Sequence, residues 1–337
     1  MKKFHNVSIA AGLILLVFLI WSIGPRTLWH DLIRLGWGVV PLVLSEFLVD
    51  LLHTFGWRRC LSSPYRQLPF WRIFGIRMAG TSINFLTPTA SLGGEVTKGT
   101  LLYMHYPGVE ATTGVIIGKL AFVLAQLVFV VIGSLVVLPW VSLPAGIWTA
   151  ILVGGGLLGL GVLGFLLVQK YGKLGQVVRW MVERRIGGKP LANAVRHLTE
   201  VDDALRDFYR AQPHDLPLSV LWHVTGFSVG IFQAWFFLHL VGGHASLMTA
   251  AGIWLLGTWF DLIAFAVPFD LGVQEGTRIL VFRIFGFSLA LGLTYGIYLR
   301  IQQITWAGIG MLIYWGMLSG KRKQENLPAS EMDGGSP

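Results

Sequence analysis

The chain contains the segment NFLTPTASLGGEVTK at residues 84–98 and the segment AFAVPFDLGVQEGTR at residues 264–278. In each segment a glutamate follows the proline by seven residues, and a basic residue, Lys98 or Arg278, follows the glutamate by three. Proline has no backbone N–H and disfavours helix in the residue before it, so each segment predicts a break between two helices. Two breaks with the same pattern of charge indicate an internal repeat.

The similarity between the two segments extends to their surroundings. A second basic residue lies in the next long apolar stretch in each case, at Lys119 and at Arg300. The flanking apolar stretches correspond as well. The sequence therefore predicts repeat A over about residues 37–138 and repeat B over about residues 216–318.

The composition of the 337 residues is typical of a membrane protein. Apolar residues make up 54% of the chain and charged residues 13%, about half the charged share of a soluble protein. This excludes a soluble enzyme, a disordered regulator and a secreted disulfide scaffold. Cys60 is the only cysteine, which excludes an internal disulfide and a cysteine-rich zinc site.

The apolar stretches predict an all-α integral membrane protein with about six full transmembrane helices. A helix needs about 20 apolar residues to cross the hydrocarbon core. The six candidate spans are residues 7–23, 37–56, 109–138, 147–168, 216–241 and 293–318. Two further apolar regions, residues 70–105 and 247–287, are interrupted by Pro88 and Pro268 and are predicted to form re-entrant helical hairpins.

The distribution of basic residues predicts the orientation. The formal net charge is +9, and Lys and Arg gather in residues 57–73, in residues 170–215 and at the start of residues 321–337. Residues 139–146 and 242–246 contain neither. Because basic loops stay cytoplasmic, both termini and both basic loops are expected in the cytoplasm, facing anionic lipids rather than nucleic acid. The hairpins then enter from opposite faces, and the repeat is inverted, as in many secondary transporters.

The expected organisation is a single polytopic domain over residues 1–320, followed by a flexible cytoplasmic tail over residues 321–337. Apolar residues recur at helical spacing within residues 170–215. This segment is predicted to be either an amphipathic helix on the membrane surface or a mere connector.

The two breaks predict a central site for a lipid with an anionic head group. A short helix begins after each break, with Ser91 and Asp270 as expected N-caps, and its positive end attracts a phosphate. Glycines near the breaks are expected to let the head group approach the backbone. Six intramembrane charges would cost roughly 15–20 kcal/mol if unpaired, so ion pairs lining a wet cavity are expected. The candidate substrate-binding residues are Asn84, Pro88, Gly93, Gly94, Glu95, Lys98, Lys119, Pro268, Gly272, Gln274, Glu275, Arg278 and Arg300.

Other polar residues within apolar stretches have two open interpretations. They are Glu46, Asp50, His53 and Asp261. The first three share one face of a predicted helix, where they could relay protons or pair with Lys119 or Arg300. All of the predicted ion pairs could also serve only to hold helices together. The nine histidines show no metal-ligand spacing, so no metal, cofactor or catalytic group is expected.

The motifs resemble the signature of a flippase-like membrane family related to the transmembrane domain of lysylphosphatidylglycerol synthase. The matching positions are Asn84, Pro88, Gly94, Glu95 and Lys98, then Pro268, Gly272, Val273 and Glu275. The amino-acid sequence of these motifs is similar in particular to that of a branch associated with hopanoid biosynthesis. The resemblance implies movement of a lipid or lipid-linked head group between the leaflets of a bacterial-type inner membrane. Lys98 stands where the family pattern has arginine, which keeps the charge but loses a bidentate phosphate contact.

Three functions follow from the resemblance and the residues. The leading expectation is a lipid translocase whose central site is built from the two broken hairpins. The alternatives are a membrane-embedded lipid-modifying transferase and a non-transporting accessory subunit of a lipid biosynthesis complex, for example one for hopanoids. Lysyl transfer by this chain alone is not expected, because no non-membrane stretch is long enough for an aminoacyl-transfer domain. The lipid, the direction of movement, the coupling ion and the oligomeric state stay open.

Overall fold

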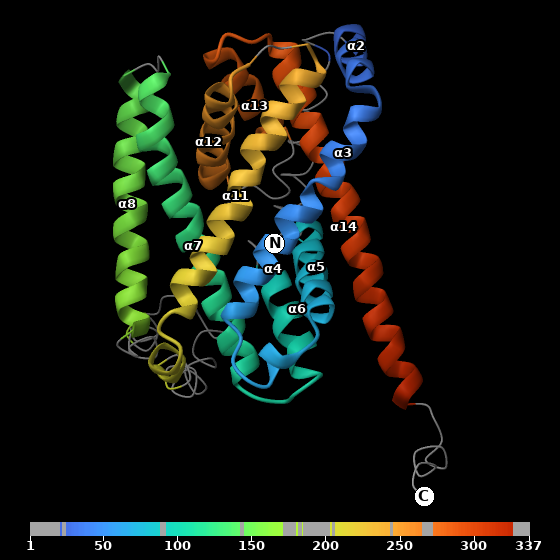
Figure 1. Cartoon of the computed structure of the whole chain (residues 1–337), viewed down its shortest axis with the longest axis vertical. Helices are drawn as coiled ribbons and strands as arrows, with labels where there is room; N and C mark the ends of the chain where they lie inside the picture. Colours follow the sequence, from blue (N-terminus) through green and yellow to red (C-terminus); the bar gives the residue numbers. More distant parts are fainter. Residues whose placement is uncertain are drawn as a thin grey trace, which may run out of the picture.

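The structure, a computed structural model, describes Trp21 and residues 25–87, 92–141, 145–170, 180, 184, 203, 206–242, 245–264 and 272–325. Every regular element within these residues is a helix, as the apolar pattern predicts. The elements are α2 (Pro25–Leu35), η1 (Gly36–Gly38), α3 (Val39–Leu44), α4 (Glu46–Arg59), η2 (Tyr65–Gln67), α5 (Phe70–Leu86), α6 (Leu92–Tyr103), α7 (Glu110–Val137), η3 (Leu138–Trp140), α8 (Ala145–Lys170), α11 (Asp215–Leu240), α12 (Leu247–Ala264), α13 (Val273–Ile284) and α14 (Leu289–Glu325). Figure 1 shows most of the long helices running along the long axis of the molecule.

Several of these helices have the length and composition of membrane spans. Three are long and apolar enough to cross a membrane: Trp29–Arg59, which runs through α2 to α4, Glu110–Val137 and Asp215–Leu240. Shorter apolar helices cover Ala145–Gly161 and Leu247–Leu262. Four of the six predicted spans coincide with helices in this group, and α14 covers another. The first predicted span, at the N-terminus, lies outside the described residues except for Trp21.

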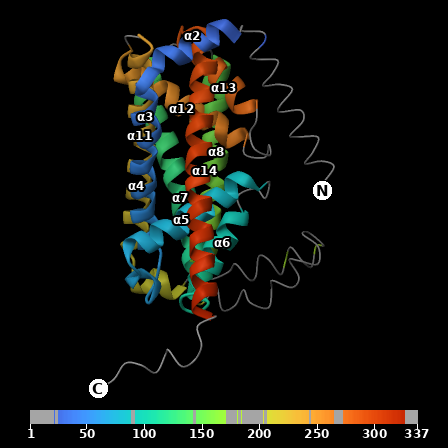
Figure 2. The same ribbon diagram turned by 90° about the vertical axis from the view of Figure 1, so that its right-hand side faces the viewer.

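Each predicted break separates two helices. α5 ends at Leu86 and α6 begins at Leu92, whereas α12 ends at Ala264 and α13 begins at Val273. Pro88 and Pro268 themselves lie outside the described residues. Figures 1 and 2 show α5 and α6 in one half of the molecule and α12 and α13 in the other. The two helix pairs therefore extend toward the middle from opposite ends.

Two hydrophobic clusters fill the two halves. One lies among α11, α12, α13 and α14 and contains the ring contacts of Phe237, Phe282 and Tyr295. The other lies among α4, α5, α6 and α7 and contains Ile73 and Ile117. Between helices in lipid, close packing and interhelical hydrogen bonds supply most of the stability, since the lipid tails are as apolar as the side chains. α11 packs against α4, α7 and α12 and so connects the two halves.

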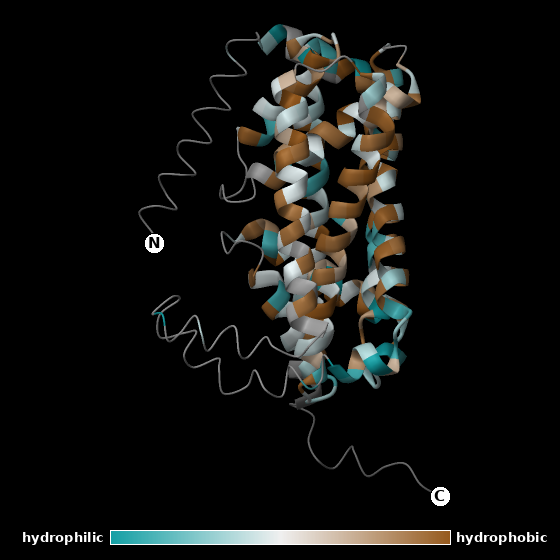
Figure 3. Ribbon diagram, turned by 90° about the vertical axis from the view of Figure 1, so that its left-hand side faces the viewer, coloured by the Kyte–Doolittle hydropathy of each residue, from teal (hydrophilic) through white to brown (hydrophobic). Residues whose placement is uncertain are grey.

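The end of the molecule where α4 ends and α11 begins is polar. The Asp215 carboxylate accepts from Arg66 at 2.6 Å and forms a second ion pair with Arg59 at 3.4 Å. Figure 3 shows hydrophilic residues gathered at this end. The predicted basic loop after α4 therefore lies beside the start of α11. Most of the basic segment 170–215 lies outside the described residues, and α14 continues to Glu325, five residues into the expected tail.

Candidate functional site

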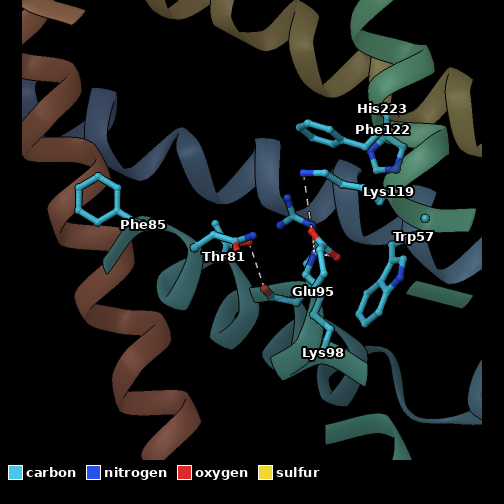
Figure 4. Close-up of a pocket in the computed structure, with 11 residues that line it drawn as sticks. Trp57, Thr81, Phe85, Glu95, Lys98, Lys119, Phe122 and His223 are labelled. Atoms are coloured by element: carbon cyan, nitrogen blue, oxygen red, sulfur yellow. Dashed lines mark hydrogen bonds and ion pairs between the residues drawn. The ribbon is translucent and has the colours of Figure 1, made fainter. Parts of the chain in front are cut away.

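A first cavity of about 340 Å³ lies among α5, α6, α7 and α11. It is lined by Trp57, Arg77, Thr81, Asn84, Phe85, Glu95, Lys98, Gly118, Lys119, Phe122 and His223. Figure 4 shows Glu95 between Lys98 and Lys119, with Phe122 and His223 on one side and Phe85 farther away on the other. Four predicted site residues (Asn84, Glu95, Lys98 and Lys119) thus share one cavity.

Glu95 is the centre of the ion pairs in this cavity. Lys98 lies three residues later on the same face of α6, and its Nζ is 2.9 Å from Oε2 of Glu95. Lys119, on α7, places its Nζ 3.8 Å from Oε1 of the same carboxylate. Arg77 also lines the cavity, so three cations face one carboxylate. We call this space the basic cavity, and its excess of positive charge favours an anion.

Two glycines set the close crossing of α5 and α6. A Cβ on Gly94 would clash with the backbone carbonyl oxygen of Gly80, and the Gly94 N–H donates to Asn84 Oδ1 at 2.6 Å. This crossing holds Glu95 and its neighbours over the basic cavity. The expectation that Gly94 leaves its backbone open to a head group is therefore wrong, because α5 occupies that space. Gly93, one residue earlier, is only partly buried.

Arg77 is a site residue that the sequence analysis does not single out. It lies within α5, is 8% exposed, and places its Nη1 2.5 Å from Oδ1 of Asp50 on α4. The expected pairing of Asp50 with Lys119 or Arg300 is wrong, because its carboxylate is held by Arg77. The sequence signal that could have identified Arg77 is a lone arginine in an apolar stretch, since a charge at membrane depth needs a partner.

A second cavity of about 190 Å³ lies among α4, α5, α12, α13 and α14. It is lined by Glu46, Asp50, Met78, Thr81, Phe85, Trp254, Asp261, Gln274, Arg278, Leu299, Gln302, Gln303, Trp306 and Ala307. Three carboxylates outnumber one cation in this lining, so we call it the acidic cavity. Thr81 and Phe85 of α5 line both cavities. Six predicted site residues are thus divided between two cavities with a common wall rather than gathered around one, since Gln274 and Arg278 line the acidic cavity. The predicted residues that line neither cavity are Gly93, Gly94, Gly272, Glu275 and Arg300.

The start of α13 is built by Gly272 and Glu275. Both expected N-caps, Ser91 and Asp270, lie outside the described residues, and the N-cap of α13 is Gly272, with φ of +73°. This left-handed conformation favours glycine. Glu275 accepts a hydrogen bond from the Gly272 N–H at 2.8 Å and another from Nε of Arg300 at 3.0 Å. Glu275 therefore fixes the beginning of α13 and connects it to α14.

Arg278 forms its ion pair with Asp261. Its Nη2 is 2.6 Å from Oδ2 of Asp261 on α12, so the two members of the helix pair α12–α13 are joined. Its guanidinium lies against Gly257, where a Cβ would be 2.8 Å from Nη1. Nε and Nη1 are buried without a hydrogen-bond partner among the described residues. Asp261, a minor candidate from sequence, thus lies at the acidic cavity together with Gln274.

Glu46 and His53, the other two candidate residues on α4, contact α11. Glu46 accepts a hydrogen bond from Nε2 of Gln233 at 3.3 Å. His53 Nδ1 is 2.7 Å from Nδ1 of His223, a residue that the sequence analysis does not single out. The available signal is again a polar residue in an apolar stretch. The pattern cannot show that the two histidines meet, because they are 170 residues apart.

The arrangement is suited to binding charged groups. The basic cavity offers ammonium and guanidinium donors, and the acidic cavity offers carboxylate and amide acceptors. In the part of the chain that the structure describes, no group of three or more His, Cys, Asp or Glu side chains could hold a metal ion.

Comparison with known protein families gives a match over most of the chain. The family described as the lysylphosphatidylglycerol synthase TM region matches residues 7–309. The match confirms the resemblance carried by the motifs around Glu95 and Glu275. No curated protein and no solved structure matches the chain.

Proposed function

The chain belongs to the family of the lysylphosphatidylglycerol synthase transmembrane region, and on this premise we propose that it moves a lipid with an anionic head group between membrane leaflets. Its family and its apolar helices make it a membrane protein. In this proposal the head group enters the basic cavity while the lipid tails stay in the bilayer.

The observation that carries the proposal is the charge of the basic cavity. Arg77 is paired with Asp50. Two lysines, Lys98 and Lys119, share the single carboxylate of Glu95. Lys119 is 40% exposed and lies 3.8 Å from Glu95, so its ammonium group is available to a ligand. An excess of positive charge at membrane depth is costly unless an anion neutralises it. A lipid phosphate has the negative charge and the acceptor oxygens that ammonium and guanidinium groups bind.

The helix pairs α5–α6 and α12–α13 are proposed to be the re-entrant hairpins of an inverted repeat. α6 and α13 have 12 residues each and are about 18 Å long, too short for a hydrocarbon core of about 30 Å. The pairs extend from opposite ends of the molecule (Figure 1), which supports entry from opposite membrane faces. The head group then passes between the two cavities along Thr81 and Phe85, which line both, and in the acidic cavity Arg278 is the cation that receives it.

The end that carries Arg59 and Arg66 is proposed to face the cytoplasm. Basic segments remain on that side of a membrane, where they also meet anionic lipids. In this proposal both termini are cytoplasmic, and the family resemblance favours a bacterial-type inner membrane.

Leaflet exchange of a fluorescent phosphatidylglycerol in proteoliposomes tests the proposal. Wild-type protein should accelerate exchange, and Lys119→Gln should slow it by at least about tenfold, equivalent to about 1.4 kcal/mol in the barrier. Glu95→Gln combined with Glu275→Gln should abolish exchange, because the first carboxylate positions both lysines and the second fixes the start of α13. The matched control is Arg283→Gln, an exposed cation of α13 that lines neither cavity.

The outcomes separate the proposal from its alternatives. Wild-type exchange rates in the Lys119→Gln and double-glutamine proteins would remove the assigned site. No exchange by the wild type, together with formation of a modified lipid, would indicate a transferase. No exchange together with copurification of a lipid synthase would indicate an accessory subunit.

A further inference from the structure

Two buried histidines meet where α4 crosses α11. His53 is 4% exposed and His223 is 2% exposed, and their Nδ1 atoms are 2.7 Å apart. Two imidazole nitrogens approach this closely only when one proton lies between them, so one ring donates and the other accepts. A neutral pair therefore has one N–H shared between the rings, and each ring keeps a second nitrogen for another proton or acceptor.

The backbone of both helices makes room for the two rings. Gly226 on α11 lies against His53, where a Cβ would be 2.9 Å from Cε1. Gly56 on α4 lies against His223, where a Cβ would be 2.8 Å from Nε2. Each histidine is thus followed three residues later by the glycine that receives the opposite ring. The packing is reciprocal, and it holds the ring nitrogens in contact.

His223 connects the histidine pair to the basic cavity. The His223 ring lines that cavity, and its Nε2 is buried with no hydrogen-bond partner among the described residues. Phe122 and Phe227 cover the His53 ring, with ring centroids 5.2 and 5.0 Å away. Apolar rings give a proton no path, so the polar lining of the basic cavity is the route between the pair and water.

The charged groups around the pair lie on α4, α5, α6 and α7. α5 contributes Arg77, α6 contributes Glu95 and Lys98, and α7 contributes Lys119. α4 contributes Asp50, which is occupied by Arg77. The resulting positive excess opposes a charged imidazolium when no anion is bound. A bound phosphate removes this opposition, because it offsets the cations.

We infer that the His53–His223 pair is a proton-binding site coupled to the anion site, so that one proton binds with each anionic head group. The inference rests on the proposed function. On anion binding, the neutral pair takes one proton from the aqueous side of the basic cavity and becomes a singly charged pair. When the anion leaves, the pair returns that proton to water. Coupling of two binding events is reciprocal, so acid must also strengthen anion binding.

The first test measures the protonation of the pair directly. Ring-¹⁵N-labelled full-length protein is placed in lipid nanodiscs of phosphatidylcholine alone or with added phosphatidylglycerol, and the His53 and His223 signals are followed between about pH 3 and pH 8. We expect one shared titration whose midpoint moves to higher pH with phosphatidylglycerol. An unchanged midpoint, or two independent titrations, would overturn the inference.

The second test uses variants of the pair. Wild-type protein should bind a short-chain phosphatidylglycerol roughly fivefold or more tightly at about pH 6 than at about pH 8. His223→Gln and His53→Gln should remove this pH dependence, and folding can be checked by thermal unfolding. Glutamine fits this interface, because Gln233 of α11 already donates to Ser45 beside α4 at 2.9 Å. His239→Gln, on α11 but lining neither cavity, should keep the pH dependence.

Leaflet exchange distinguishes failure of the inference from failure of the proposed function. Exchange of phosphatidylglycerol with an unchanged histidine midpoint rejects the proton site and leaves the translocase. A shifted midpoint without exchange rejects the translocase and leaves the coupled site. Retained pH dependence of binding in both glutamine variants also rejects the proton site.

Discussion

Asp50 and Arg77 form a buried ion pair at 2.5 Å between α4 and α5, with side chains that are 6% and 10% exposed. Removing one partner from such a pair leaves an uncompensated charge, so Asp50→Asn should destabilise the protein by about 3 kcal/mol or more. Thermal unfolding in detergent measures this loss. Asp203→Asn breaks the exposed pair with Arg206 and should change stability by less than about 1 kcal/mol. Equal stability of the two variants would contradict a structural role for Asp50.

Cys60 allows folding to be followed by chemistry. It follows α4 directly, is fully buried, and lies 3.2 Å from the Ser219 hydroxyl. Burial raises the pKa of its thiol from 9.0 to about 12, so the folded protein holds almost no reactive thiolate near neutral pH. A maleimide should label Cys60 slowly until the protein unfolds, whereas an added cysteine at exposed Ser63 should react at once. Rapid labelling of Cys60 in the folded protein would contradict this placement.

The same thiol gives stability a pH dependence. Because the folded-state pKa is the higher one, its contribution is complete below pH 9.0 and is lost as pH rises toward about 12. Cys60→Ala should therefore flatten the alkaline part of the stability curve.

Among individual residues, the sequence identified most of the charges, with Arg77 as the exception, but not all of their partners. Glu95 and Lys98 could be paired from sequence, because a spacing of three residues places them on one face of a helix. The same spacing holds for Glu275 and Arg278, yet Arg278 binds Asp261 and Glu275 binds Arg300. These partners lie on neighbouring helices, and local spacing contains no information about which helix faces which.

At the scale of elements, the crossing of α5 and α6 depends on a backbone contact. Gly94→Ala would place a methyl group against the Gly80 carbonyl oxygen, and backbone cannot move aside as a flexible side chain can. We expect a loss of about 1–3 kcal/mol in stability. Gly161→Ala in α8 is the matched control, because a Cβ there meets no atom within 4 Å, and alanine favours helix. A Gly94→Ala protein as stable as the control would contradict the close crossing of these helices.

α5 also forms the common wall of the two cavities. Thr81→Trp should fill the passage beside Phe85 and slow phosphatidylglycerol exchange by at least about tenfold, equivalent to about 1.4 kcal/mol in the barrier. Thr225→Trp places the same indole on an exposed position of α11 and should leave exchange unchanged. Wild-type exchange by the Thr81→Trp protein would show that the lipid does not pass between the cavities.

The element boundaries illustrate what hydropathy and proline can predict. The apolar runs predicted α7 and α11 to within a residue or two, because a helix in lipid must satisfy its own backbone. Pro88 and Pro268 predicted the helix breaks that follow α5 and α12. The N-cap of α13 could not be predicted in the same way. Gly272 caps the helix through its positive φ angle, whereas several nearby residue types could have served as caps instead.

At the scale of the whole molecule, the ends that carry Ser63 and Ser246 should face opposite sides of the membrane. Cysteines introduced at Ser63 and Ser246, which are both exposed, should react with an impermeant maleimide from opposite sides of the membrane. Ser63 should be labelled from the cytoplasmic side, beside the basic residues Arg59 and Arg66. Labelling of both from the same side would contradict the orientation proposed for the two helix pairs.

The repeated motifs indicated two related halves, and the structure contains two helix pairs and two hydrophobic clusters. The division of the polar interior into a basic and an acidic cavity was not predictable from the motifs. It arises because Asp50, Asp261 and Arg77 lie outside the two matched segments, residues 84–98 and 264–278, and change the charge on each side of α5.

The selectivity of leaflet exchange for lipid charge tests directly whether the basic cavity is an anion site. Fluorescent phosphatidylglycerol and phosphatidylcholine are compared in the same proteoliposomes, for wild-type protein and for Lys98→Gln combined with Lys119→Gln. Wild-type protein should move the anionic lipid faster, and the double variant should lose this preference. Equal rates for both lipids in the wild type, or an undiminished preference in the variant, would contradict an anion site in the basic cavity.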